Sequence, residues 1–210
     1  MTRALPAVRG EPSERVVFAV DDPAVDPYRL LTALVVPRPI AWISTMSAGG
    51  VPNLAPHSFF TVASARPPIV QFTSVGTKDT LRNVLATQEF VVCLASQPLI
   101  DQVNATSAPY ASTVDEAAAV GVKMEPSELV IPPRVAESPA SIECTLHSTV
   151  DLGESTLVLG DVRGITVQSA ALVDGHPTID ALLPVSRLGR NEWGLPPPVV
   201  ALDRPTKPPS

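Results

Sequence analysis

The chain has 210 residues, which is enough for one domain with a sizeable apolar core. Hydrophobic residues make up 45% of the chain and charged residues 17%, a composition that excludes a disordered chain and is typical of a globular protein. Its 21 acidic residues outnumber its 15 basic residues and give a net charge of −6, which disfavours nucleic-acid binding. Any phosphate-bearing ligand therefore has to be held by a few local donors.

The sequence also indicates the compartment. No apolar stretch has the length of a bilayer span, and the apolar run at 16–20 is too short for a signal peptide. The two cysteines, Cys93 and Cys144, each lie in an apolar run, which favours buried, reduced thiols. We therefore expect a cytoplasmic protein that binds neither membranes nor nucleic acid.

Proline divides the chain into parts. The 24 prolines concentrate in the first 40 residues, between residues 126 and 139, and in the last 15 residues. Proline lacks a backbone N–H and fits poorly inside a sheet, so these regions read as extended or irregular. We expect a flexible leader at 1–15, one domain at 16–193 and a proline-rich tail at 194–210.

In chain order, the first elements are short. The pattern predicts an edge strand at 16–20, and the two prolines within 35–39 exclude a helix there. A strand at 40–45 ends at a hairpin-like turn, 47–50. The stretch 53–56 is predicted to be irregular.

The middle of the chain mixes strands with helices. Strands are predicted at 58–63, 69–73 and 90–94. Apolar residues at spacings of three and four predict a helix over 79–87, and a shorter helix is expected at 99–103.

The last elements are the longest strands. Thr113 and Glu116 have the spacing of a capping box for a short helix. Alternation over 141–150 predicts a half-buried strand, and a long strand returns over 156–167, in which Gly160 and Gly164 indicate bulges or a barrel corner. Six or more short strands without β-α-β alternation favour an antiparallel barrel with inserted helices.

Several chemistries have no signature in the sequence. The three histidines are scattered, and no zinc spacing, nucleophile elbow, Walker A loop or G-x-G-x-x-G pattern occurs. A hydrolase built from scattered residues stays open, but no motif points to one.

Polar residues gather instead in three segments, 37–45, 53–60 and 78–83. Lys78 and Thr80 open the predicted helix, where unpaired N–H groups and the positive end of the dipole favour an anion. Together with the hydroxyls of Ser44 and Thr45, they suit one phosphate monoester. Asp79 beside them is interpreted as an acid that favours the first helical turn and can cap it.

The stretch 53–56 suits backbone groups that approach the edge of a flat heterocycle, and three side chains could frame its faces: Trp42, His57 and Phe59. Each residue also has an ordinary interpretation. Trp42 and Phe59 could be core residues, His57 a structural histidine, and Ser44 and Thr45 polar residues at a strand end.

The order of these motifs resembles a known family. Pro-Arg-Pro-Ile-Ala-Trp-Ile-Ser-Thr at 37–45, Asn-Leu-Ala-Pro-His-Ser-Phe-Phe at 53–60 and Lys-Asp-Thr-Leu-Arg-Asn at 78–83 closely resemble the flavin reductase-like, FMN-binding split-barrel family. The likeness continues through short motifs up to Ser-Arg-Leu-Gly at 186–189, and it covers roughly residues 28 to 190.

The resemblance implies a fold and a site. The fold would be a mainly β, six-stranded antiparallel Greek-key split barrel with inserted helices, forming a homodimer with FMN at the interface. The phosphate would be held by Ser44, Thr45, Lys78 and Thr80, and the isoalloxazine edge would lie against Asn53, Ala55, Ser58 and Phe59. Arg38 and Trp42 would lie near the ring or the ribityl chain, and the segment from Arg187 to Asn191 would close over the substrate side. Two positions depart from the family pattern, Arg190 for a small residue and Trp193 for tyrosine, so the shape of the substrate side stays open.

The function that follows is an FMN-binding oxidoreductase, an NAD(P)H-dependent flavin reductase that passes electrons to free flavin, oxygen, a ferric chelate or a partner oxygenase. Because the chemistry belongs to the cofactor, no residue is assigned as catalytic, and His57 is a candidate modulator of the flavin. Two alternatives stay open: a flavin-dependent oxygenase or reductase of one organic substrate, and an FMN electron carrier without turnover.

Overall fold

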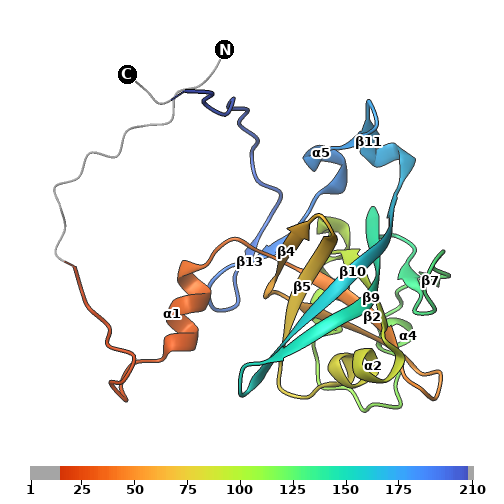
Figure 1. Cartoon of the computed structure of the whole chain (residues 1–210), viewed down its shortest axis with the longest axis horizontal. Helices are drawn as coiled ribbons and strands as arrows, with labels where there is room; N and C mark the ends of the chain where they lie inside the picture. The colour runs from red at the N-terminus through yellow and green to blue at the C-terminus, as the bar shows by residue number, and fades with distance from the viewer. Residues whose placement is uncertain (1–14, 208–210) are drawn as a thin grey trace.

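The computed structural model describes residues 15–207 of the chain (Figure 1). Its centre is one antiparallel sheet of seven strands in the order β3-β2-β6-β9-β10-β5-β4. The strands are β2 (Ala41–Met46), β3 (Pro52–His57), β4 (Phe60–Ala65), β5 (Pro68–Val75), β6 (Glu89–Leu94), β9 (Ala140–Asp151) and β10 (Ser155–Val167). The mainly β, antiparallel class is confirmed, although this sheet has seven strands instead of six.

Short elements surround the sheet. The helices are α1 (Pro27–Leu34), α2 (Asp79–Thr87), α3 (Ile100–Ala105), α4 (Glu116–Ala119) and α5 (Ile179–Leu182), with 3-10 turns at Gln97–Leu99 and Ser169–Ala171. The small strands are β1 (Arg38–Pro39), β7 (Met124–Glu125), β8 (Arg134–Val135), β11 (Leu172–Val173), β12 (His176–Pro177), β13 (Ser186–Arg187) and β14 (Trp193–Gly194). In the described part of the chain, none of the helices has the length and apolar character needed to cross a bilayer.

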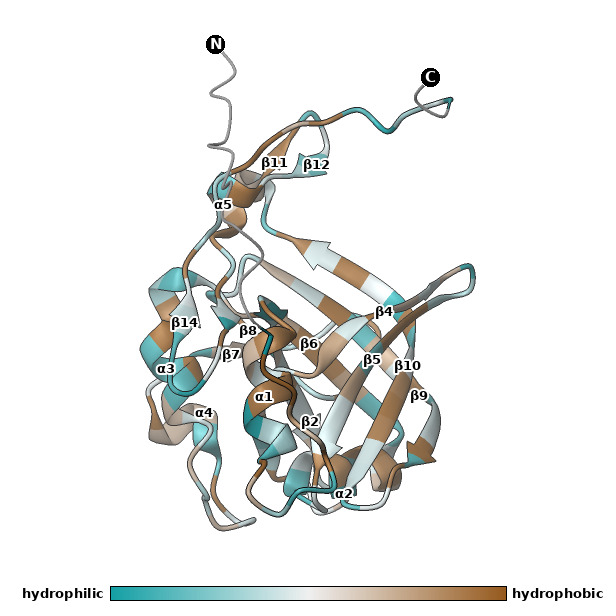
Figure 2. Cartoon of the chain, turned by 90° about the vertical axis from the view of Figure 1, so that its left-hand side faces the viewer, coloured by the Kyte–Doolittle hydropathy of each residue, from teal (hydrophilic) through white to brown (hydrophobic). Residues whose placement is uncertain are grey.

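Two apolar clusters form the core, and β2 contributes to both. Trp42 lies in the cluster that α3 and α4 cover, while Ile43, next along the strand, lies in the cluster under α2. This follows from the strand period of two, which sends successive side chains to opposite faces. Figure 2 shows apolar and polar residues alternating along the long strands. One cluster contains Cys93 and the other Cys144, and both thiols are free, as predicted.

The bulges expected at two glycines of β10 are present. The register against β9 shifts at Gly160 and again at Gly164. A Cβ added at Gly160 would lie 2.3 Å from Cζ of Phe90, whose side chain is fully buried. Only glycine therefore fits where β10 crosses the barrel core.

Three local predictions are wrong. Residues 16–20 form no strand, and their valine side chains are exposed. Residues 53–56, expected to be irregular, lie within β3, and Pro56 is tolerated there because β3 is an edge strand. The strand expected at 58–63 begins at Phe60 instead.

The capping box expected at Thr113 and Glu116 does not form. Asp115 caps α4 by accepting from the backbone N–H of Ala118, 3.1 Å away. Glu116 is buried, and its carboxylate accepts from the backbone N–H of Leu54 at 3.0 Å, which ties α4 to β3.

The alternation along β9 also hides one buried acid. Glu143 lies on the polar side of the pattern but is fully buried. Its carboxylate accepts from the backbone N–H groups of Glu128 at 3.0 Å and Leu129 at 2.6 Å, and it lies 3.6 Å from the guanidinium of Arg134. These partners compensate the carboxylate for the loss of its hydration. Because Glu143 is buried on the polar side of the pattern, the start of β9 is covered on both faces.

Candidate functional site

Two adjoining cavities lie beside the sheet. The first, called here the barrel cavity, has a volume of about 530 Å³ and is lined by residues of β3, β5, the start of α2 and the loop 106–110. The second, called here the arginine cavity, has a volume of about 740 Å³ and lies between α1 and the segment 187–193. The two share Tyr28, Pro56, Ser58 and Ser107 as a common wall.

Most of the predicted cofactor residues line the barrel cavity: Asn53, Ala55, His57, Ser58, Phe59, Lys78 and Thr80. Arg38 and Arg187 line the arginine cavity, whereas Trp42, Ser44, Thr45 and Asn191 line neither. The three separate segments are therefore brought together, but not every predicted residue reaches the cavity.

The strand β3 provides one wall of the barrel cavity. Asn53, Ala55 and His57 alternate along it and so point to the same side of the sheet. The amide nitrogen of Asn53 donates to the hydroxyl of Thr80 at 3.1 Å, which joins β3 to the first turn of α2.

Three residues of β2 line neither cavity and lie behind this wall, so their predicted contacts with a ligand stay predictions. Trp42 is fully buried, and its indole N–H donates to the hydroxyl of Thr106 at 2.8 Å. The hydroxyl of Thr45 accepts from the side-chain amide of Asn83 at 3.0 Å. Ser44 is fully buried as well. Trp42 and Thr45 thus hold Thr106 and α2 in place, whereas the buried hydroxyl of Ser44 has no hydrogen-bond partner among the described residues.

The start of α2 offers an anion site. Lys78 is the N-cap residue of α2, and its side chain does not cap the helix. The backbone N–H groups of the first turn therefore have no capping side chain as a hydrogen-bond acceptor. Asp79 does not cap the helix as expected, because its carboxylate pairs with the guanidinium of Arg82. An oxyanion here would meet one lysine and the positive end of a nine-residue helix.

His57 supplies an acceptor on the same wall. Burial lowers the pKa of His57 to about 4, with Lys78 lowering it further against the opposing effect of the Thr73 carbonyl, so the ring is neutral near pH 7. Its Nδ1 lies 3.3 Å from the carbonyl oxygen of Thr73. Because a carbonyl only accepts, Nδ1 carries the proton and Nε2 has a free lone pair. Nε2 is buried and has no partner among the described residues, so it can accept a hydrogen bond from a ligand.

Sequence reasoning missed part of this cavity. Tyr28 of α1, the loop 106–110 and Glu116 of α4 all line it. Burial raises the pKa of Glu116, whose carboxylate holds Leu54. Asp26 followed by Pro27 was an available signal for the start of α1, since Asp26 caps it by accepting from the N–H of Arg29 at 3.2 Å.

The arginine cavity is held together by Arg38, which is buried. Its guanidinium donates to the carbonyls of Thr32 and Val35 at the end of α1 and, at 2.8 Å, to the carbonyl of Leu188. Burial, and then the charge of Arg187, lower the pKa of Arg38. The Nη donors of Arg38 are used on backbone carbonyls, its buried Nε has no partner among the described residues, and its contact with a flavin stays a prediction.

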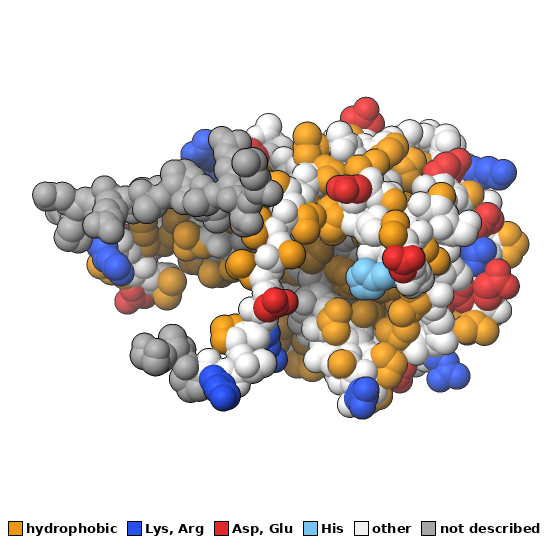
Figure 3. All heavy atoms as spheres, turned by 90° about the horizontal axis from the view of Figure 1, so that it is seen from above, with side chains coloured by type: hydrophobic (Ala, Val, Ile, Leu, Met, Phe, Trp, Pro, Cys, Tyr) orange, Lys and Arg blue, Asp and Glu red, His pale blue; other side chains and the backbone are white. Residues whose placement is uncertain are grey.

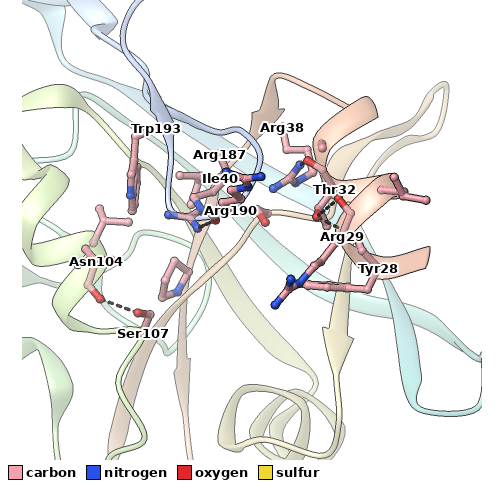
Figure 4. Close-up of a pocket in the computed structure, with 15 residues that line it drawn as sticks. Tyr28, Arg29, Thr32, Arg38, Ile40, Asn104, Ser107, Arg187, Arg190 and Trp193 are labelled. Atoms are coloured by element: carbon pink, nitrogen blue, oxygen red, sulfur yellow. Dashed lines mark hydrogen bonds between the residues drawn. The ribbon is translucent and has the colours of Figure 1, made fainter. Parts of the chain in front are cut away.

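The segment 187–193 forms the opposite wall of this cavity (Figure 4). The guanidinium of Arg187 lies over the ring of Trp193, 4.9 Å from its centroid, and donates to the carbonyl of Arg190 at 2.8 Å. Gly189 packs on α1, and a Cβ there would lie 3.3 Å from Cβ of Ala33. Asn191 is exposed and lines neither cavity, so its place on the substrate side stays a prediction.

Comparison with known proteins gives the family. A model of the flavin reductase like domain matches residues 33–181, which is most of the chain. The chain belongs to the flavin reductase-like family. An uncharacterized protein of Halalkalibacterium halodurans is 38% identical over 191 residues, covering 85% of this chain and 91% of the relative. One of Deinococcus radiodurans is 38% identical over 174 residues, covering 77% of each.

Solved structures agree with this assignment. Nitrilotriacetate monooxygenase component B from Bacillus cereus is 26% identical with a TM-score of 0.84, covering 90% of this chain and 100% of that one. The 2-nitrobenzoate 2-nitroreductase of Pseudomonas fluorescens is 28% identical with a TM-score of 0.81, covering 88% and 93%. An FMN-binding protein from Thermus thermophilus, 16% identical with a TM-score of 0.72 and covering 92% and 100%, shares the fold.

The family binds flavin, and the barrel cavity fits an FMN. Its volume of about 530 Å³ falls within the range of about 300–1,000 Å³ that small-molecule sites occupy. Lys78 and the uncapped start of α2 suit the phosphate, and the free lone pair of His57 Nε2 suits a hydroxyl or ring N–H of the ligand. Phe59 and Tyr28 offer aromatic surface.

Proposed function

We propose that the protein is an FMN-binding oxidoreductase that takes electrons from NADH or NADPH and passes them to an acceptor: free flavin, oxygen, a ferric chelate or a partner oxygenase. One observation carries the proposal. A single cavity combines a lysine at an uncapped helix start with a buried, unpartnered histidine nitrogen on the β3 wall. A phosphate at one end and a hydrogen-bonding heterocycle at the other match these two features.

Bound FMN would supply the electron transfer itself. The chain's own residues bind and orient it. Lys78 and the first turn of α2 would hold the phosphate, and the contact between Asn53 and Thr80 keeps that turn against β3. His57, neutral near pH 7, can accept a hydrogen bond but carries no spare proton, so it would tune the ligand and would not act as a general acid.

A second part of the proposal concerns assembly. We propose a homodimer with FMN at the subunit interface. Leu31 and Leu34 of α1 and Val35 just after it are exposed, and Tyr28 of the same helix lines both cavities. Hydrophobic side chains are also spread over the face seen in Figure 3. Surface of this kind commonly marks a protein interface. Light scattering on the FMN-loaded protein should give twice the chain mass, and a monomer that holds FMN tightly would contradict the interface placement.

The first experiment is FMN binding. The purified protein should be yellow or should take up FMN, measured by quenching of flavin fluorescence. Lys78→Ala should weaken FMN binding by about 10- to 100-fold, because it removes the lysine from the phosphate end. Lys123→Ala, at an exposed lysine outside both cavities, is the matched control. Unchanged FMN affinity in Lys78→Ala would remove that lysine from the site.

The second experiment is steady-state oxidation of NADH and of NADPH, with and without added FMN or FAD. Turnover with either nucleotide supports a reductase, and the ratio of the two rates gives the donor preference. A protein that binds FMN but oxidises neither nucleotide would be an electron carrier. Turnover only when a specific organic acceptor is added would favour the dedicated oxygenase or reductase.

A further inference from the structure

The lining of the arginine cavity has an unusual charge. Four arginines, Arg29, Arg38, Arg187 and Arg190, line it, and none of the described residues that line it is an aspartate or a glutamate. The whole chain carries a net charge of −6, so this concentration runs against the overall charge. Figure 4 shows Arg187 and Arg190 reaching in from one side and Arg29 from α1 on the other.

Three of these four arginines have no acidic partner among residues 15–207, and in two of them, Arg187 and Arg190, the guanidinium is not engaged by a cluster of carbonyls as that of Arg38 is. Arg29 pairs with Asp26 at 3.2 Å, and the two Nη groups of Arg38 donate to carbonyls, while its buried Nε has no partner among the described residues. Within residues 15–207, neither Arg187 nor Arg190 forms an ion pair. Arg187 is close enough to Arg38 for its charge to lower the pKa of Arg38. An anion in the cavity would relieve this repulsion and provide the missing acceptor.

The rest of the wall combines apolar and aromatic side chains with uncharged polar groups. The ring of Trp193 lines the cavity, and Ile40 and Val103 line it as well. The polar groups that accompany them, from Ser58, Asn104 and Ser107, are uncharged. A ligand that satisfies the whole lining therefore combines an oxyanion with a planar apolar body.

We propose that the arginine cavity binds an organic oxyanion, a carboxylate or a phosphate on a flat apolar body, with Arg187 and Arg190 as its direct partners. Arg38 acts as a positioning residue that fixes the segment carrying both. Because the cavity shares Tyr28, Pro56, Ser58 and Ser107 with the barrel cavity, such a ligand would lie next to a flavin, as the electron donor or acceptor. Only this last role rests on the proposed function.

The test uses the intrinsic fluorescence of the full chain without flavin. The chain has two tryptophans: Trp42 is fully buried, while Trp193 lines the cavity, so a ligand there changes the emission of Trp193 alone. Three probes share one ring: benzoate carries a carboxylate, phenyl phosphate a phosphate, and benzamide no charge. We expect saturable changes with at least one of the two anions at concentrations about tenfold below those needed for benzamide. The anion that binds tighter identifies the source of the oxyanion.

Variants make the assignment specific. Arg190→Gln should weaken binding of the preferred anion by about tenfold, while Arg163→Gln, at an exposed arginine of β10 outside both cavities, should leave it unchanged. Trp193→Phe should abolish the signal. The proposal is overturned if benzamide binds as tightly as both anions, if Arg190→Gln binds like the unaltered chain, or if the signal survives in Trp193→Phe.

An FMN titration of the same variants separates this inference from the proposed function. Arg190→Gln should bind FMN as the unaltered chain does, because Arg190 does not line the barrel cavity. Failure of FMN binding together with selective anion binding would refute the flavin role and leave the oxyanion site standing. FMN binding without any anion selectivity would refute the oxyanion site alone.

Discussion

The two cavities share a wall but are built in different ways. The barrel cavity rests on regular elements, β3, β5 and α2, joined by side-chain hydrogen bonds such as that between Asn53 and Thr80. The arginine cavity lies between one exposed helix and a segment near the end of the domain, and Arg38 bridges them through backbone carbonyls. The first cavity therefore depends on the large sheet and α2, and the second also on the small sheet β1-β13-β14 and the side chain of Arg38.

Their electrostatics differ as well. The barrel cavity holds acids beside its bases: Asp79 is paired with Arg82, and Glu116 with a backbone N–H. The arginine cavity carries arginines without acids in its described lining. The barrel cavity suits a ligand with one localised anionic end. The arginine cavity suits an anionic ligand whose charge neutralises the arginines of its wall.

The largest expected effect tests how far the barrel supports both cavities. Gly160→Ala should lower the free energy of unfolding by about 3 kcal/mol, because the new Cβ meets the buried ring of Phe90. Gly164→Ala is the matched control, since its Cβ meets only the exposed side chain of Leu129. Urea unfolding followed by circular dichroism measures both. An equal loss of unfolding free energy in the two variants would show that the core around Phe90 rearranges to accept the added methyl group.

A second prediction concerns the pH dependence of stability that the buried, neutral His57 of the barrel cavity causes. The folded protein holds the pKa of His57 near 4, while the unfolded chain has an ordinary value near 6.5. Between these values the unfolded state binds more protons, so stability falls as the pH falls. From about pH 7 to about pH 5, the unaltered chain should lose about 2 kcal/mol through this residue.

The measurement for His57 is urea unfolding of the chain without flavin at a series of pH values. The variant His57→Gln should show an acid-induced loss that is smaller by that amount, because glutamine does not titrate. Parallel stability curves for the two proteins would show that His57 titrates normally and that its site is wetter than the structure indicates.

The smallest expected effect concerns the arginine cavity alone. Arg38→Met keeps most of the side-chain volume but removes the donors to the carbonyls of Thr32 and Leu188. Because the segment near Leu188 can open to water, we expect a loss of only about 1 kcal/mol in unfolding free energy. Anion binding, read from Trp193 emission, should weaken, while FMN affinity should hold. A parallel loss of FMN affinity would show that the two cavities are not separable.

The same contrast explains what could be predicted from the sequence. Helix α2 was found at its observed bounds, Asp79–Thr87, because its apolar spacing is local, and Lys78 and Thr80 were placed correctly beside a cavity. The sequence alone does not decide what Ser44 and Thr45 contact, because hydroxyls at a strand end look alike whether they face a ligand or, like that of Thr45, a neighbouring asparagine.

Residues brought in by distant segments could not be predicted. Tyr28, Tyr110 and Glu116 reach the barrel cavity from a helix, a loop and another helix that no local pattern connects to it. The departure at Arg190 was visible in the sequence, but its meaning depends on Arg29, about 160 positions away, lining the same cavity. When distant segments bring charged side chains into one cavity, the sequence shows no periodic pattern that would predict it.

The placement of the two cysteines has a practical consequence. Burial raises the pKa of Cys93 and of Cys144 to about 12, so neither thiol forms the reactive thiolate while its surroundings stay closed. Each belongs to a different core cluster. Alkylation of the native protein, followed by mass spectrometry of the two cysteine peptides, would therefore time the opening of each half of the core separately.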